Sequence, residues 1–195
     1  MFKSTCRLSM YSLGVYLMNV AKAIEVLDVW ALRGRYVFTH RDMIKLFLED
    51  SAKTLQEGIN RLVKQQILER VARGIYIYRR TPRRDAYPLE HIAVAMRRGD
   101  YSYVSLESAL SEYGAISQIP MDRLTVMTTG RKGTYRTPYG TIEFTHTKRP
   151  AGDVIKRMKD IGRPLRFATL ESAWADLKRV GRNTHLVDLK NAFDD

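Results

Sequence analysis

The chain has 195 residues, 45% of them hydrophobic and 28% charged, which allows one large or two small globular domains. Cys6 is the single cysteine, which excludes an internal disulfide framework and a thiolate metal site and favours a reducing cytoplasm. The net charge is +12, and two windows supply this excess. Residues 61–84 hold eight Lys and Arg against one Glu, and residues 123–149 hold six against one Glu. Such concentration indicates a polyanionic partner. The alternative is a solvated charged surface, and it carries more weight for the second window.

The first residues partly resemble a secretory signal. Two basic residues precede an apolar run over residues 8–20, and Ala21-Lys22-Ala23 imitates a cleavage site. Polar residues interrupt the run, however, and it is too short to span a bilayer. We interpret residues 1–19 as an extra N-terminal segment, or as sequence upstream of a start at Met18.

Three short amphipathic helices are predicted next. Val20, Ile24, Leu27 and Ala31 share one helical stripe, which Gly34 ends. After an extended stretch at residues 36–39, Thr39 caps a second helix, with Asp42 favouring its N-terminus. Its expected inward residues are Met43, Ile44, Phe47 and Leu48. Ser51 then caps a third helix, whose apolar stripe is Ala52, Leu55, Ile59, Leu62 and Val63.

A β-hairpin follows the third helix directly. Its predicted strands are residues 68–72 and 75–78, and Arg73-Gly74 joins them in a tight turn that needs positive φ. A basic helix followed by a basic hairpin is typical of a winged helix-turn-helix. In that fold the exposed face of the third helix enters the DNA major groove, and the hairpin touches phosphate or the minor groove. The candidate DNA-binding residues are Lys53, Thr54, Asn60, Arg61, Lys64, Arg70, Arg73 and Tyr76.

The second half of the chain is predicted to be a mixed domain. Residues 81–88 contain two prolines and form the expected linker between a domain at 1–80 and one at 89–195. Helices are expected near residues 89–96, 105–113, 154–161, 169–177 and 186–193. Strands are expected at 100–104, 123–127, 142–146 and 166–168, with a basic loop at 128–141. The predicted fold class is therefore α+β: an N-terminal winged helix-turn-helix domain and a C-terminal domain with a small sheet.

Catalysis has little support in the sequence. The stretch Thr129-Gly130-Arg131-Lys132-Gly133-Thr134 lacks the order of a phosphate-binding loop, so we interpret it as a basic hairpin tip. It could also be the Gly-x-x-Gly clamp of an RNA-binding KH fold, but flanking strands argue against that. No acidic cluster resembles a nuclease metal site, and the histidines lie far apart in sequence. We therefore expect no enzyme, no cofactor and no metal.

Four segments together resemble AbiEi-type antitoxins in their order and spacing. They read LQEGINRLVKQQILERVARGIYIY, YSYVSLESALSEYGAI, LTVMTTGRKGTYRTPYGTIEFTHTKRP and RFATLESAWADL, and the resemblance extends from Val20 to Leu177. The succession of segments carries the resemblance, because no single motif is specific. The N-terminal twenty residues fall outside the pattern, and the part after Leu177 diverges from it.

The resemblance implies a cytoplasmic antitoxin of a type IV toxin–antitoxin system, acting in phage defence. Its winged helix would repress its own operon by binding double-stranded operator DNA at inverted repeats. Its second domain would neutralise a nucleotidyltransferase-like toxin without a stable complex, and no membrane is involved. The antitoxin surface would contain Arg131, Lys132, Tyr135 and Arg136. Two alternatives stay open: a winged-helix regulator whose second domain binds a ligand or protein, and a nucleic-acid enzyme with a winged-helix targeting domain.

Overall fold

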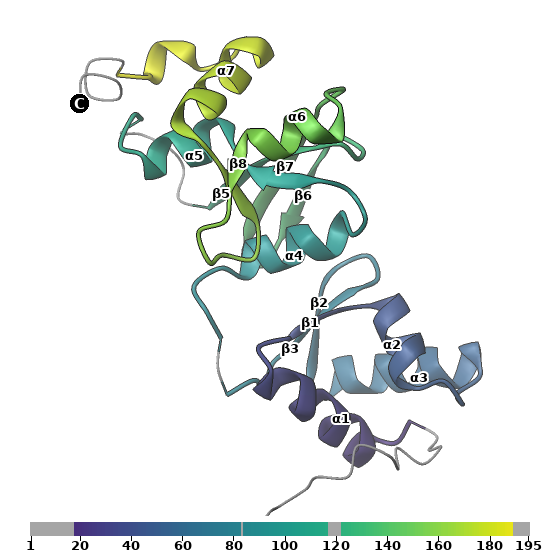
Figure 1. Ribbon diagram of the computed structural model, residues 1–195. Coiled ribbons are helices and arrows are strands. Elements are labelled where there is room, and N and C mark those ends of the chain that lie inside the picture. The colour runs from purple at the N-terminus through teal and green to yellow at the C-terminus, as the bar shows by residue number, and fades with distance from the viewer. Residues whose placement is uncertain (1–17, 83, 117–121, 189–195) are drawn as a thin grey trace, which may run out of the picture.

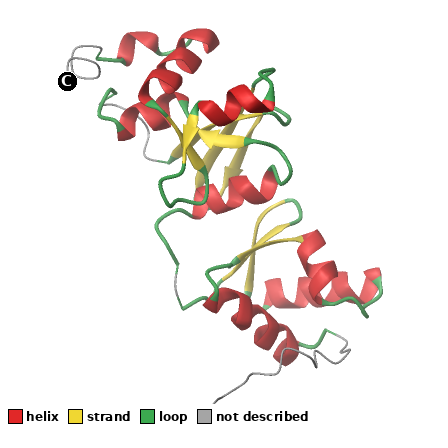
Figure 2. Ribbon diagram, in the orientation of Figure 1, coloured by secondary structure: helices red, strands yellow, loops and turns green. Residues whose placement is uncertain are grey.

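The computed structural model describes residues 18–82, 84–116 and 122–188. These residues form an α+β fold with seven α-helices and two sheets (Figures 1 and 2), which confirms the predicted class at that level. The N-terminal half combines three helices with a three-stranded sheet. The C-terminal half combines four helices with a six-stranded sheet. The two halves meet mainly at a helix that lies between the sheets.

The N-terminal half follows the predicted order of elements. Its elements are α1 (Val20–Leu32), β1 (Val37–Thr39), α2 (His40–Leu46), α3 (Ala52–Lys64), β2 (Leu68–Ala72) and β3 (Ile75–Tyr78). Thr39 and Asp42 form a capping box at the start of α2, and the Ser51 hydroxyl accepts from the Thr54 N–H at the start of α3. Side-chain caps of this kind satisfy backbone donors that the first helical turn leaves free.

The small sheet has the order β1-β3-β2, with antiparallel pairing throughout. Its central strand β3 is buried at all four residues. Alternation explains this, because successive side chains point to opposite faces of a strand. Tyr76 and Tyr78 join the core beneath the three helices, whereas Ile75 and Ile77 join the core shared with the C-terminal half. Both faces of the sheet are therefore covered.

The C-terminal half is built on the larger sheet. Its elements are α4 (Pro88–Met96), β4 (Ser102–Val104), α5 (Leu106–Glu112), β5 (Arg123–Thr128), β6 (Gly133–Thr137), β7 (Gly140–His146), α6 (Ala151–Lys156), β8 (Met158–Lys159), β9 (Arg166–Ala168) and α7 (Leu170–Val180). The strand order is β6-β7-β5-β4-β9-β8. The pairs β5–β7 and β4–β9 are parallel, and the other pairs are antiparallel. Helices α5 and α7 lie on the face away from the N-terminal half, as Figure 1 shows.

Helix α4 joins the two halves. It lies between the sheets in Figure 1, against β1 and β3 on one side and β7 on the other. Its residues Ile92 and Ala93 are fully buried in a core that also contains Val37 and Ile77 of the small sheet. One hydrophobic core therefore runs across the linker that we predicted at residues 81–88.

Several sequence predictions were wrong. The expected basic loop at 128–141 contains strand β6. The expected helix near 154–161 ends at Lys156, and β8 follows it. The expected last helix is a short 3-10 turn at Thr184–Leu186, and residues 189–193 lie outside the described part. Ile44 and Leu48 do not face inward but are 45% and 78% exposed.

No helix in the described part of the chain combines the length and the apolar character needed to cross a bilayer.

Candidate nucleic-acid interface

The outer face of α3 is polar and open to solvent. Lys53, Asn60, Arg61 and Lys64 are exposed on it, while Leu55, Ile59 and Leu62 are buried on the opposite side. The Asn60 amide oxygen accepts a hydrogen bond of 3.0 Å from the Gln56 side chain one turn earlier. This contact orients the Asn60 amide by engaging its oxygen. The face can therefore offer guanidinium, ammonium and amide donors side by side.

Two other residues of α3, Thr54 and Glu57, limit which groups this face can bind. Thr54 is half-buried, and its hydroxyl lies 2.9 Å from the Ser51 hydroxyl, so it belongs mainly to the cap of α3. Glu57 is exposed in the middle of the helix and is its single carboxylate. A carboxylate can accept from a cytosine amino group but repels phosphate. The geometry therefore suits base contact in the middle of α3 and phosphate contact near its ends.

The hairpin β2–β3 carries two exposed arginines. Arg70 lies on β2 opposite Tyr76, and Arg73 lies in the turn before Gly74, whose φ of +71° is the left-handed conformation that glycine favours. Tyr76 itself is 4% exposed and packs beneath the helices. Its prediction as a DNA-contacting residue is therefore wrong, because it occupies the central strand of a sheet covered on both faces.

The second basic window runs from β5 to the residues after β7, and three of its six cations lie on or directly before strand β6. Arg131, Lys132 and Arg136 are exposed, whereas Tyr135 is half-buried. The Tyr135 ring packs edge-on against Phe144 at 5.8 Å between ring centroids, and its hydroxyl accepts a 2.9 Å hydrogen bond from Arg97. Tyr135 therefore anchors the strand. Arg131 and Lys132, which precede the strand, and Arg136 on it are exposed to solvent.

The structure brings parts of the two basic windows together. Strand β2 of the small sheet lies against strand β6 of the large sheet. Sequence reasoning missed this proximity, because the windows are separated by more than thirty residues and no local pattern reports which strands meet across α4. The residues that we expected on a DNA-binding surface and those that we expected on an antitoxin surface are therefore far apart in sequence, but strands that carry some of them are neighbours in space.

A charged cluster at the start of α2 links the halves near this surface. The Asp42 carboxylate accepts from Arg98 at 2.6 and 3.0 Å and pairs with Arg35 at 2.7 Å. Burial by itself raises the pKa of the Asp42 carboxyl, but hydrogen bonds from Arg98, Thr39 and Arg35 outweigh burial and hold the pKa well below its usual range. Asp42 therefore stays ionised, and Arg35 and Arg98 share its single negative charge.

The other buried carboxylates of the C-terminal half are also paired with arginines. Arg182 holds Glu107 through two hydrogen bonds of 2.9 and 3.1 Å and also binds Glu143. Asp176 is fully buried and accepts from Arg149 at 2.6 Å and from Tyr103 at 2.9 Å. Carboxylates held in this way lack free ligand positions. Among residues 18–82, 84–116 and 122–188, no group of three or more His, Cys, Asp or Glu could hold a metal ion.

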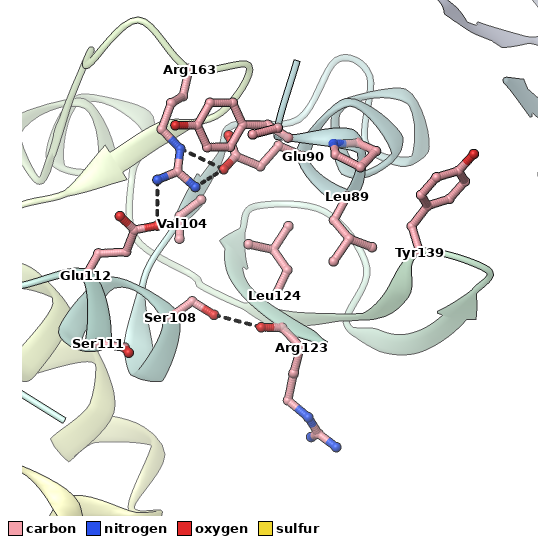
Figure 3. A pocket seen from close by; sticks show the side chains of 13 residues that line it. Leu89, Glu90, Val104, Ser108, Ser111, Glu112, Arg123, Leu124, Tyr139 and Arg163 are labelled. Carbon is pink, nitrogen blue, oxygen red and sulfur yellow. Dashed lines mark hydrogen bonds and ion pairs between the residues drawn. The ribbon is translucent and has the colours of Figure 1, made fainter. Parts of the chain in front are cut away.

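A cavity of about 400 Å³ lies beside the linker (Figure 3). Leu89 and Leu124 contribute apolar wall, and Arg163 lies at its rim. The guanidinium of Arg163 donates to Glu90 at 2.8 Å and to Glu112 at 2.7 Å, so its charge is already satisfied. The size falls within the range of small-molecule pockets.

Comparison with known proteins gives a family but no activity. A family model described as a family of unknown function (DUF6088) matches residues 30–163, more than half of the chain. A search of curated proteins finds no match. Among solved structures, the RV2827C protein from Mycobacterium tuberculosis is similar with a TM-score of 0.53 at 16% identity, over 84% of this chain. This chain spans 62% of that one, and the similarity shows the fold alone.

Proposed function

We propose that this chain, which belongs to the DUF6088 family, is a DNA-binding transcriptional autorepressor and the antitoxin of a type IV toxin–antitoxin system. The observation that carries the DNA-binding part is the polar, basic outer face of α3 next to the basic hairpin β2–β3. Three helices followed by a hairpin that pairs with β1 are the parts of a winged helix-turn-helix. This arrangement supports α3 as the recognition helix and β2–β3 as the wing.

The residue types suit duplex DNA. Arg61 and Asn60 are the side-chain types that bind guanine and adenine bidentately, each contributing about 1–3 kcal/mol of discrimination. Lys53, Lys64, Arg70 and Arg73 are the candidate phosphate contacts. If about six phosphates are contacted, the logarithm of affinity falls with the logarithm of salt concentration at a slope of about −5.

A gel shift on the protein's own promoter tests this part of the proposal. We expect the double variant Asn60→Ala/Arg61→Ala to bind the promoter at least tenfold more weakly than wild type. The control pair Lys178→Ala/Arg179→Ala on α7 removes one positive charge more, and we expect it to bind like wild type. Equal binding by all three proteins, or no promoter binding by wild type, would remove the regulator assignment.

The antitoxin part of the proposal rests on the resemblance of the four segments to AbiEi-type antitoxins. Its test is rescue of growth when the full chain is co-expressed with a neighbouring nucleotidyltransferase-like gene product. The full chain is needed, because α4 packs on both sheets and a fragment starting at residue 89 would expose Ile92 and Ala93. If the Asn60→Ala/Arg61→Ala variant rescues growth without binding the promoter, the two activities are separable. Absence of rescue by wild type would exclude the antitoxin role.

The cavity favours a second candidate function, a winged-helix regulator whose C-terminal half binds a small ligand. The cavity adjoins residues 86–90, which connect the two halves, so an occupant could change promoter binding. A ligand that alters the gel shift of wild type but not of a Leu124→Trp variant would favour this candidate over the antitoxin.

A further inference from the structure

We infer that strand β6 and the turn before it bind the phosphate backbone of DNA beside the wing, so that three cations of the second basic window extend the first into one nucleic-acid surface. The inference rests on the proposed DNA-binding function and deepens it. It assigns Arg131, Lys132 and Arg136 to DNA rather than to a toxin.

One end of this surface is fixed by contacts between the hairpins of the two sheets. The turn between β6 and β7 carries Tyr139, whose hydroxyl donates to the Glu69 carboxylate on β2 at 2.8 Å. The same hydroxyl accepts from Arg84 at 3.1 Å. Glu69 is the one acidic residue of the first basic window, and this hydrogen bond engages it. Strands β2 and β6 are thus held side by side at this end.

The other end is fixed through the start of α2 and the end of α4. The His40 N–H donates to the Gly74 carbonyl in the wing turn at 2.8 Å. Two residues later, Asp42 binds Arg98, and the adjacent Arg97 donates from its Nε to the Arg131 carbonyl at 3.0 Å. The wing turn and the turn before β6 are therefore attached to the same end of α4.

The side chains between these two ends are suited to phosphate. Tyr135 points toward α4, so alternation directs Thr134 and Arg136 to the face of the large sheet away from α4, and Arg136 meets the DNA at the open edge that β6 forms. The extended path from Arg131 to Arg136 is about 16 Å long. One DNA strand presents about five phosphates along that length. Asp100 lies against Gly130 and is an exposed carboxylate at the wing-turn end of this path. Because a carboxylate repels phosphate, we expect the phosphate contacts mainly on the side of the path away from Asp100.

The test compares two triple variants that remove the same charge. Arg131→Gln/Lys132→Gln/Arg136→Gln changes the proposed surface at the β6 edge. Lys156→Gln/Lys178→Gln/Arg179→Gln changes α6, which packs on the opposite edge strand β8, and α7, which packs on α5. All six side chains are exposed, and Arg97 contacts Arg131 through its carbonyl, so both variants should melt like wild type. Fluorescence anisotropy with a random 40-base-pair duplex is measured between about 50 and 200 mM salt, the range over which counterion release is resolved.

We expect the β6 variant to reduce the salt slope by about 2.7 and to weaken binding on the order of 10²-fold near 0.1 M salt, since each lost phosphate contact removes about 0.9 from the slope. The α6–α7 variant should match wild type. If both variants weaken binding equally, or if neither does, the inference is overturned while DNA binding by wild type stands. If the β6 variant binds DNA normally but fails to rescue growth from the toxin, these residues face the toxin and the inference is also overturned. If wild type binds no duplex, the proposed function fails first.

Discussion

At the residue scale, Asp42 connects local and long-range structure. Its carboxylate accepts from the Thr39 N–H at 2.7 Å, closing the capping box of α2, and it also binds Arg98 from the C-terminal half. Its side chain is 7% exposed, so removing the charge leaves two arginines with poorer partners. A sequence pattern could identify the cap, because Thr39 and Asp42 have the required spacing. The partners Arg35 and Arg98 depend on how the halves pack.

We predict that Asp42→Asn lowers the free energy of unfolding by about 2 kcal/mol at pH 7, since hydrogen bonds to charged groups contribute about 1.5–3 kcal/mol. The folded-state pKa of Asp42 is depressed. The stabilisation of the fold by the ionised carboxylate is therefore fully present above the ordinary pKa of 3.8, and it is lost as pH falls through the lower folded-state pKa. Urea unfolding at pH 7 and pH 3 should therefore show the gap between wild type and variant narrowing in acid. Glu49→Gln, an exposed carboxylate in the loop before α3, is the control and should show no such gap. A gap independent of pH would contradict the assignment.

At the element scale, helices with a cap and a clear stripe were predictable from sequence. Ser51 and the stripe through Leu55, Ile59 and Leu62 predict α3 because capping and burial are local or periodic properties. The turn at Arg73-Gly74 predicts the hairpin for a similar reason. Exposure of the polar face of α3 followed directly from the same periodicity.

Other elements depended on tertiary packing and were not predictable. Strand β6 has an alternating pattern of half-buried and exposed residues, but its one glycine and two threonines are residue types that loops also favour. Which residues of β6 face inward depends on Phe144 and Arg97, because these side chains contact Tyr135 only in the folded chain. Tyr76 was misassigned because a strand covered on both faces has no polar side, so periodicity cannot show which residues reach solvent.

The packing of α3 against Met18 gives a second prediction. A Cβ added at Gly58 would collide with the thioether sulfur of Met18, whose side chain is buried and whose N–H donates to the Asp50 carboxylate at 2.9 Å. Gly58→Ala gains about 1 kcal/mol of helix propensity. Displacing buried Met18 costs more, roughly 1.5–3 kcal/mol. We therefore expect Gly58→Ala to lower the free energy of unfolding by about 1 kcal/mol, measured by urea denaturation.

Gly152 in α6 is a matched control, because an added Cβ there meets nothing within 4 Å. Gly152→Ala should stabilise the protein by up to about 1 kcal/mol. In a Met18→Ala background the obstacle at Gly58 is gone, so Gly58→Ala should become stabilising. If it still destabilises in that background, Met18 is not the cause.

At the scale of the whole molecule, α4 makes one folding unit of two sheets. Val37, Val71, Ile75 and Ile77 of the small sheet are buried in the same core as Ile92 and Ala93 of α4. The N-terminal elements and the C-terminal half therefore share apolar contacts as well as the Asp42–Arg98 pair. This shared core gives the hairpin β2–β3 and β6 a fixed relation, on which the proposed common nucleic-acid surface depends.

We predict that the double substitution Val37→Thr/Ile75→Thr destabilises the full chain but improves the solution behaviour of a fragment of residues 18–82. In the full chain the two hydroxyls enter a closed apolar core, so the free energy of unfolding should fall by about 2–3 kcal/mol, measured by urea denaturation. In the fragment the same face is uncovered, so the substitutions should reduce aggregation and binding of an apolar dye. Thr keeps strand propensity in both cases, which separates burial from local structure. A full chain unaffected by the substitutions would mean that α4 does not cover this face, and a single surface across both halves would then lose its basis.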